Sequence, residues 1–104
     1  MNDNVNNVVY IIGKDNVDSI PFDESRKPIP LYEGLYDMTV SGRVYSHYRK
    51  RFLARCNDEY GFHVVSLYKN GQSKDFNLFV LWKETFENKL SEYDFKGARE
   101  VIYK

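Results

Sequence analysis

The chain has 104 residues, of which 42% are hydrophobic and 16% aromatic, and it carries no net charge at pH 7. This composition predicts one folded domain over residues 1–104 and excludes an intrinsically disordered chain. The neutral total argues against strong nucleic-acid binding by bulk charge alone, and no apolar run reaches the roughly 18 residues of a membrane span.

The beginning of the chain predicts no structure. Residues 1–7 are polar and rich in Asn and Asp, do not resemble a signal peptide, and are expected to be frayed. The single cysteine, Cys56, allows no internal disulfide and is typical of a reducing compartment. We therefore expect a cytoplasmic protein that does not bind membranes.

The first half of the chain predicts β structure. Val8–Ile12 is a short run of mostly β-branched apolar residues, and we expect a strand there. Residues 13–30 contain all three prolines and several Asp and Ser residues, which predicts a long irregular connection. Two further strands, 36–40 and 43–48, flank a Ser-Gly pair, and this arrangement predicts a hairpin.

A second hairpin and a helix are predicted downstream. Residues about 62–68 and 74–77 flank an Asn-Gly pair, which is typical of a tight hairpin turn. Apolar residues then recur at helical spacing over about 78–90, with Asn77 as the N-cap, and residues 91–104 are a candidate second short helix. The predicted fold class is α+β, with a small antiparallel sheet of hairpins followed by a C-terminal helix.

Charge is distributed unevenly along the chain. Residues 1–37 hold seven acidic and three basic residues, whereas residues 38–83 hold eight basic and three acidic ones. Basic side chains contact phosphates, and hydroxyl groups add further hydrogen bonds. One interpretation is therefore a nucleic-acid-binding surface made by Arg43, Tyr45, Ser46, Arg49, Lys50, Arg51 and Arg55. The other is a solvated strand face whose Tyr rings pack inward and whose Arg43 pairs with Glu33 or Asp37.

Residues 27–86 carry a series of short motifs in a specific order. The first part contains Lys27-Pro28-Ile29, Tyr32-Glu33-Gly34, Tyr36, Gly42-Arg43-Val44 and Ser46. The second part contains Leu53, Tyr60-Gly61, Val65, Leu67, Asn70-Gly71, Phe79-Val80-Leu81-Trp82 and Phe86. In this order and spacing, the motifs resemble the nuclease-associated modular DNA-binding domain of the fourth NUMOD type. They also resemble the adjoining front half of phage and intron HNH homing endonucleases.

The resemblance implies a DNA-binding module of phage or mobile-element origin that works in the host cell cytoplasm. It implies contact with the phosphate backbone of duplex DNA through the basic hairpin region. The family's His and Arg before the helix are replaced by Phe79 and Val80. A nuclease also needs a general base and metal ligands, whereas His47 and His63 lie sixteen residues apart within the β region. We therefore expect no catalytic residue, no metal or other cofactor, no small-molecule substrate and no enzyme activity.

A second function remains open. The acidic first third and the tyrosines and arginines, which are common anchors of protein interfaces, also suit a small interaction protein. In this alternative, a phage-encoded protein binds a host protein and inhibits or redirects it.

Overall fold

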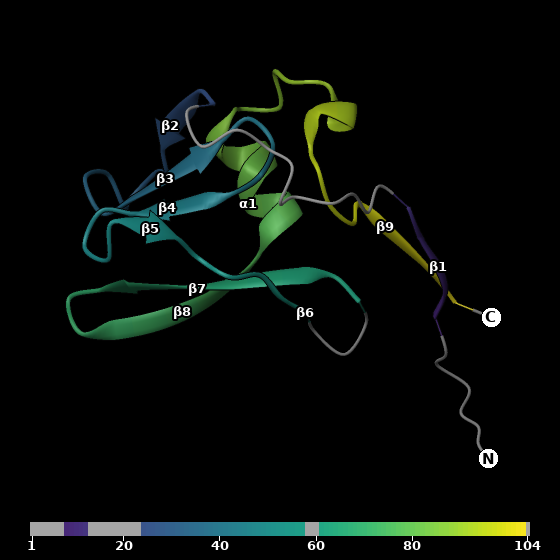
Figure 1. The fold of residues 1–104 in the computed structure, drawn as a ribbon, viewed down its shortest axis with the longest axis horizontal. Coiled ribbons are helices and arrows are strands. Elements are labelled where there is room, and N and C mark those ends of the chain that lie inside the picture. The colour runs from purple at the N-terminus through teal and green to yellow at the C-terminus, as the bar shows by residue number, and fades with distance from the viewer. Residues whose placement is uncertain (1–7, 13–23, 58–60, 104) are drawn as a thin grey trace, which may run out of the picture.

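The computed structural model describes residues 8–12, 24–57 and 61–103, and within them the chain forms antiparallel sheets and one α-helix (Figure 1). One sheet has four strands: β2 (Arg26–Pro28), β3 (Tyr36–Thr39), β4 (Val44–Ser46) and β5 (Arg51–Phe52). Another has three: β6 (Cys56–Asn57), β7 (His63–Lys69) and β8 (Gln72–Asn77). A separate pair consists of β1 (Val8–Ile12) and β9 (Glu100–Tyr103). The predicted α+β fold and the predicted first strand are confirmed.

The β7–β8 hairpin follows directly from its turn residues. Asn70 and Gly71 have φ angles of 54° and 77°, the left-handed conformation that a type I′ turn requires. Along β7, His63, Val65 and Leu67 are buried, whereas Ser66 between them is exposed. The strands therefore alternate between the core and solvent, and the predicted hairpin is confirmed with β8 starting two residues earlier than expected.

The β3–β4 hairpin is also confirmed. Gly42 has a φ of 97° and donates its N–H to the Thr39 carbonyl at 3.0 Å, while the Thr39 N–H donates to the Arg43 carbonyl at 2.8 Å. Glycine is suited to this position because it lacks the Cβ that disfavours positive φ.

The expected irregular connection over residues 13–30 is wrong at its end. Residues 26–28 form the edge strand β2, in which Lys27 lies opposite Met38. Pro28 is tolerated there because an edge strand leaves one row of backbone N–H groups without a ladder partner. The frayed start expected for residues 1–7, and the part of the connection from 13 to 23, lie outside the described residues.

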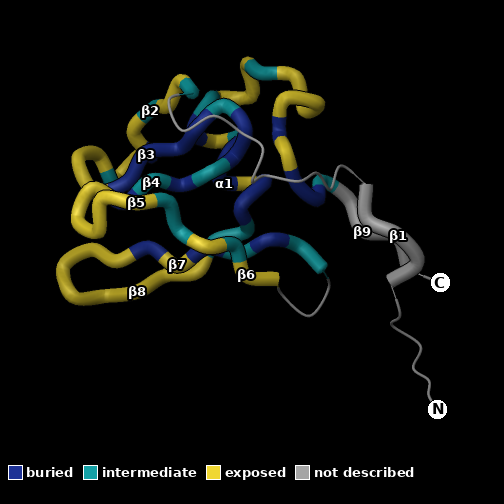
Figure 2. The backbone as a smooth tube through the Cα atoms, viewed as in Figure 1, coloured by how far each residue is buried: buried dark blue, intermediate teal, exposed yellow. Residues whose placement is uncertain are grey.

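The core lies between the two larger sheets and the helix α1 (Leu78–Thr85). Trp82 is almost completely buried, and its ring packs near the rings of Phe79, Phe86 and Phe95. Its indole N–H donates to the Val40 carbonyl at 2.9 Å, which ties the helix to the end of β3. Figure 2 shows the buried segments of β3, β4 and β7 on the inside and exposed loops at one end of the molecule.

The helix begins as predicted but ends earlier. The Asn77 side chain accepts the Val80 N–H at 3.1 Å, which confirms the predicted N-cap. The expected extension to about residue 90 is wrong, because Glu87 and Asn88 adopt φ angles of 57° and 58°. The Asn88 N–H then donates to the Lys83 carbonyl at 2.9 Å and closes the last turn.

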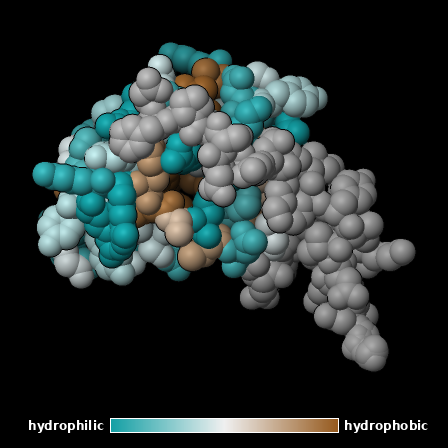
Figure 3. Space-filling model, viewed as in Figure 1, coloured by the Kyte–Doolittle hydropathy of each residue, from teal (hydrophilic) through white to brown (hydrophobic). Residues whose placement is uncertain are grey.

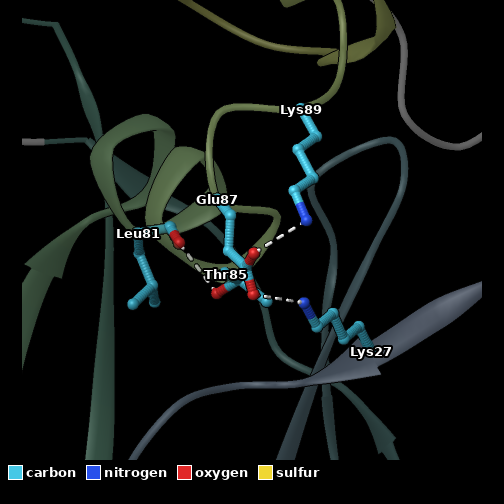
Figure 4. A network of polar contacts seen from close by, with 5 residues as sticks. All are labelled: Lys27, Leu81, Thr85, Glu87 and Lys89. Carbon is cyan, nitrogen blue, oxygen red and sulfur yellow. Dashed lines mark hydrogen bonds and ion pairs between the residues drawn. The ribbon is translucent and has the colours of Figure 1, made fainter.

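The Glu87 carboxylate helps to hold this helix end. Lys89 Nζ lies 3.0 Å from one of its oxygens, and Lys27 Nζ from β2 lies 3.4 Å from the other (Figure 4). Figure 4 also shows Thr85, whose hydroxyl donates to the Leu81 carbonyl at 2.8 Å. The hydrogen bonds from Lys89 and Lys27, and then their charges, lower the pKa of Glu87 below its ordinary value of 4.5.

Because of these two ion pairs, the contribution of Glu87 to the free energy of unfolding is expected to depend on pH. A carboxyl group whose pKa is lowered by folding stabilises the fold above its unfolded pKa, and the stabilisation is lost as pH falls through the folded value. Glu87→Gln is therefore expected to lower the free energy of unfolding at pH 7, with the difference from wild type shrinking below about pH 4.5. Urea unfolding at neutral and acidic pH measures this, with Glu92→Gln as the control. An equal difference at both pH values would contradict it.

The candidate second short helix is mostly wrong. Only the single 3₁₀ turn η2 (Glu92–Asp94) forms, capped by the Ser91 hydroxyl, which accepts the Tyr93 N–H at 3.2 Å. The end of the segment is the strand β9, in which Val101 lies opposite Ile11 of β1. Pairing with a strand ninety residues earlier in the chain overrides the weak helical pattern.

Candidate nucleic-acid interface

The four-stranded sheet has an outer face that points away from the core. The register places Asp37 opposite Tyr45 and Tyr45 opposite Phe52, so that these side chains share one face. Their neighbours along the strands, such as Met38 and Val44, are buried and belong to the core.

Two arginines stack on aromatic rings of this outer face. The Arg26 guanidinium lies 4.0 Å from the centre of the Tyr45 ring, and that of Arg43 lies 3.7 Å from the centre of the Phe52 ring. The two rings are themselves in edge-to-face contact, with centres 5.3 Å apart. We call Arg26, Arg43, Tyr45 and Phe52 the stacked arginine face. Stacking holds each planar cation in place, which favours directed hydrogen bonds to oxygen acceptors.

Asp37 is an acidic residue on the same face as Tyr45. One of its carboxylate oxygens lies 2.9 Å from Nε2 of His47 and 3.4 Å from Nε of Arg26. Among the described residues, no ion pair joins Arg43 to Glu33 or Asp37, so the alternative pairing of Arg43 with one of these carboxylates does not form. The Glu33 carboxylate instead accepts the Leu31 N–H at 3.2 Å.

The β4–β5 hairpin carries three exposed cations, Arg49 and Lys50 in the turn and Arg51 at the start of β5, which we call the basic turn. Ser46, which is 1% exposed, accepts the Arg49 N–H with its hydroxyl at 3.1 Å and the Lys50 N–H with its carbonyl at 2.7 Å. The Ser46 hydroxyl thus shapes the turn. Lys50 has a φ of 56°, an uncommon conformation for a residue with a side chain. Within the described ranges, none of the three cations forms an ion pair.

Arg55 lies elsewhere, between the β3–β4 turn and Phe95. Its Nη2 donates to the Gly42 carbonyl at 2.9 Å, and its guanidinium lies 5.3 Å from the centre of the Phe95 ring. Burial, and then the charge of Arg43, lower the pKa of Arg55 to about 10, so that it remains a cation at neutral pH. The two arginines border a hollow of about 450 Å³ whose lining includes Val44 and Leu53. On the face of the molecule drawn in Figure 3, hydrophobic residues lie in a hollow and hydrophilic residues flank it.

The structure thus divides the residues that were predicted as one surface. Arg43 and Tyr45 lie on the stacked arginine face, and Arg49, Lys50 and Arg51 lie on the basic turn, whereas Ser46 and Arg55 are directed into the fold. The sequence prediction missed Arg26, which lies in the acidic first third of the chain and next to Lys27 at the start of the motif. Pairing of β2 with β3 brings it to this face.

Two other features are absent from the described residues. No three His, Cys, Asp or Glu side chains in that part of the chain are grouped so that they could hold a metal ion. Within the same ranges, no helix is long and apolar enough to cross a membrane.

Both the sequence and the structure of this chain are similar to known proteins. The NUMOD4 motif matches residues 24–68, which include both the stacked arginine face and the basic turn. The chain is also similar to a solved structure on DNA binding and cleavage by the HNH homing endonuclease I-HmuI, with 26% sequence identity and a TM-score of 0.59. The similarity covers 77% of this chain and 52% of the solved one, so this chain spans about half its length. No curated protein matches the chain.

The predicted resemblance is therefore confirmed by two independent comparisons, one of sequence motifs and one of three-dimensional structure. Residues 24–68 match the NUMOD4 motif, within a chain whose fold is similar to part of an HNH homing endonuclease.

Proposed function

We propose that this protein is a non-catalytic module that binds duplex DNA, with its basic turn and stacked arginine face against the phosphate backbone. The observation that carries the proposal is the basic turn, where three exposed cations without ion pairs in the described residues project from one NUMOD4 hairpin. Neighbouring Arg26 and Arg43 add two cations held on aromatic rings. The similarity to an HNH homing endonuclease whose solved structure concerns DNA binding supports the same partner.

The arrangement suits phosphate contact in physical terms. Cations that neutralise phosphates release condensed counterions, and this release supplies most of the affinity of sequence-independent binding. A planar guanidinium can also donate two parallel hydrogen bonds to one phosphate group. In this proposal Tyr45 and Phe52 position the arginines, Ser46 shapes the turn, and Arg55 supports the β3–β4 turn through the Gly42 carbonyl.

We propose further that the chain does not cleave DNA. Phe79 and Val80 stand where the family has His and Arg, and the buried Phe79 ring packs on Trp82. Both histidines already have side-chain partners, Asp37 for His47 and Asn57 for His63, each at 2.9 Å. Incubation with supercoiled plasmid and Mg²⁺ is expected to leave the plasmid intact, and nicking by pure protein would overturn this part of the proposal. A phage or mobile-element origin and a place in the host cytoplasm complete the proposal.

DNA binding itself is tested by fluorescence anisotropy with a labelled duplex. The expected result is binding at 50 mM salt that weakens on the order of 100-fold at 200 mM, because about four phosphate contacts release counterions and the free energy gained by this release falls as salt rises. Failure to bind duplex DNA at the lower salt concentration would overturn the proposed function. The comparisons give no support to the alternative partner, a host protein.

A further inference from the structure

A cleft of about 510 Å³ lies beside the basic turn, between loops that are far apart in the sequence. Its walls come from the end of the β2–β3 connection, from the β4–β5 turn and from the Asn70-Gly71 turn of the β7–β8 hairpin. Figure 2 shows exposed loops gathered at this end of the molecule. The cleft therefore opens next to the surface that we propose for DNA.

Two tyrosine rings line this cleft without packing on any other ring of the described chain. Tyr48 is 93% exposed and Tyr68 is 56% exposed. The floor between them is fixed, because the Tyr36 hydroxyl accepts the Tyr68 N–H at 3.1 Å and joins the β7–β8 hairpin to β3. Exposed aromatic rings over a rigid apolar floor are typical of a surface that stacks on a ligand.

All the charged residues that line the cleft are basic. Arg49 comes from the basic turn, and Lys69 comes from the end of β7. The Lys69 ammonium donates to the Leu31 carbonyl and lies 5.7 Å from the centre of the Tyr32 ring, two residues outside the cleft lining, so that Arg49 supplies the cation for a ligand in the cleft. The complementary ligand has a flat aromatic ring and a negative charge, which together are the features of a nucleotide.

We propose that the cleft holds an unpaired nucleotide of bound DNA, with its base stacked on Tyr48 and Tyr68 and its phosphate beside Arg49. This inference rests on the proposed function. A volume of about 510 Å³ is within the range of small-molecule sites and admits one nucleotide. A base inside a duplex is stacked on both faces, so it must leave the helix to enter, which is easiest where it has no partner. Aromatic stacking of this kind tolerates any base.

The test compares one labelled duplex in two forms, fully paired and with a single unpaired adenine, by fluorescence anisotropy at constant salt. The bulged form is expected to bind about tenfold more tightly, as stacking of one base on aromatic side chains predicts. Y48L/Y68L is expected to lose this preference and to keep its affinity for the paired form. Y48F/Y68F, which retains both rings, is expected to keep the preference.

Tyr93→Leu is the matched control, because Tyr93 is 79% exposed and does not line the cleft. If Y48L/Y68L fails to fold, Tyr48→Leu alone serves, since a ring that is 93% exposed contributes little packing. Equal affinity for the two duplexes, or a preference that Y48L/Y68L retains, overturns the inference while the proposed function stands. Failure of both duplexes to bind overturns both proposals.

Discussion

The triple variant R49A/K50A/R51A is expected to bind duplex DNA on the order of 100-fold more weakly than wild type at about 0.1 M salt. Each cation of the basic turn is exposed and lacks an ion pair among the described residues, so its contact with phosphate has no competitor within this part of the chain. Removal of three phosphate contacts should also make the salt dependence of log K less steep by about three. Anisotropy titrations at four or more salt concentrations measure both quantities.

The control for this prediction is K83A/K89A/K96A. It removes the same charge from α1 and the segment that follows it, outside the NUMOD4 motif. If affinity depends on where the cations are placed, the control retains most of its affinity. An equal loss in the two variants would mean that bulk charge, not the basic turn, determines binding.

Gly42→Ala is expected to lower the free energy of unfolding by about 3 kcal/mol or more. Gly42 has a φ of 97°, and a Cβ added there would lie 2.4 Å from a ring atom of the buried Phe95. The substitution therefore combines the cost of a positive φ, about 1–2 kcal/mol, with that of overpacking, about 1–3 kcal/mol. Urea denaturation of wild type and variant measures the difference.

Gly34→Ala separates the two contributions. Gly34 has a φ of 82°, but a Cβ there would have nothing within 4 Å. The free energy of unfolding of Gly34→Ala is therefore expected to fall by only about 1–2 kcal/mol, because of backbone strain. Equal losses in the two variants would show that the Phe95 ring moves aside without cost.

The features that the sequence predicted well depend on neighbouring residues. The Asn70-Gly71 turn and the Gly42 turn follow from the backbone conformations that these residues favour. Asn77 caps α1 by accepting the N–H of Val80, only three residues further along the chain. The misplaced features depend on distant contacts. The end of α1 is held by Lys27, sixty residues before Glu87, and β9 forms by pairing with β1. Patterns of neighbouring residues in the sequence cannot predict contacts between residues that lie this far apart in the chain.

In the candidate site, too, some features follow from neighbouring residues and others depend on distant contacts. The basic composition of residues 43–55 was visible in the sequence, but sheet register and burial decide where each side chain points. Arg43, which immediately precedes β4, and Tyr45 within β4 share the outer face because they are two residues apart in extended chain, whereas Ser46, one residue further, faces the core. Arg26 joins them only through the pairing of β2 with β3.

The most direct test of the central claim is a two-dimensional ¹H–¹⁵N NMR titration of the full chain with duplex DNA. The account predicts that the largest shift changes fall on residues 43–53 and on Arg26, with little change in β9 or on α1. Shift changes concentrated on α1 or β9, with residues 43–53 unaffected, would contradict it.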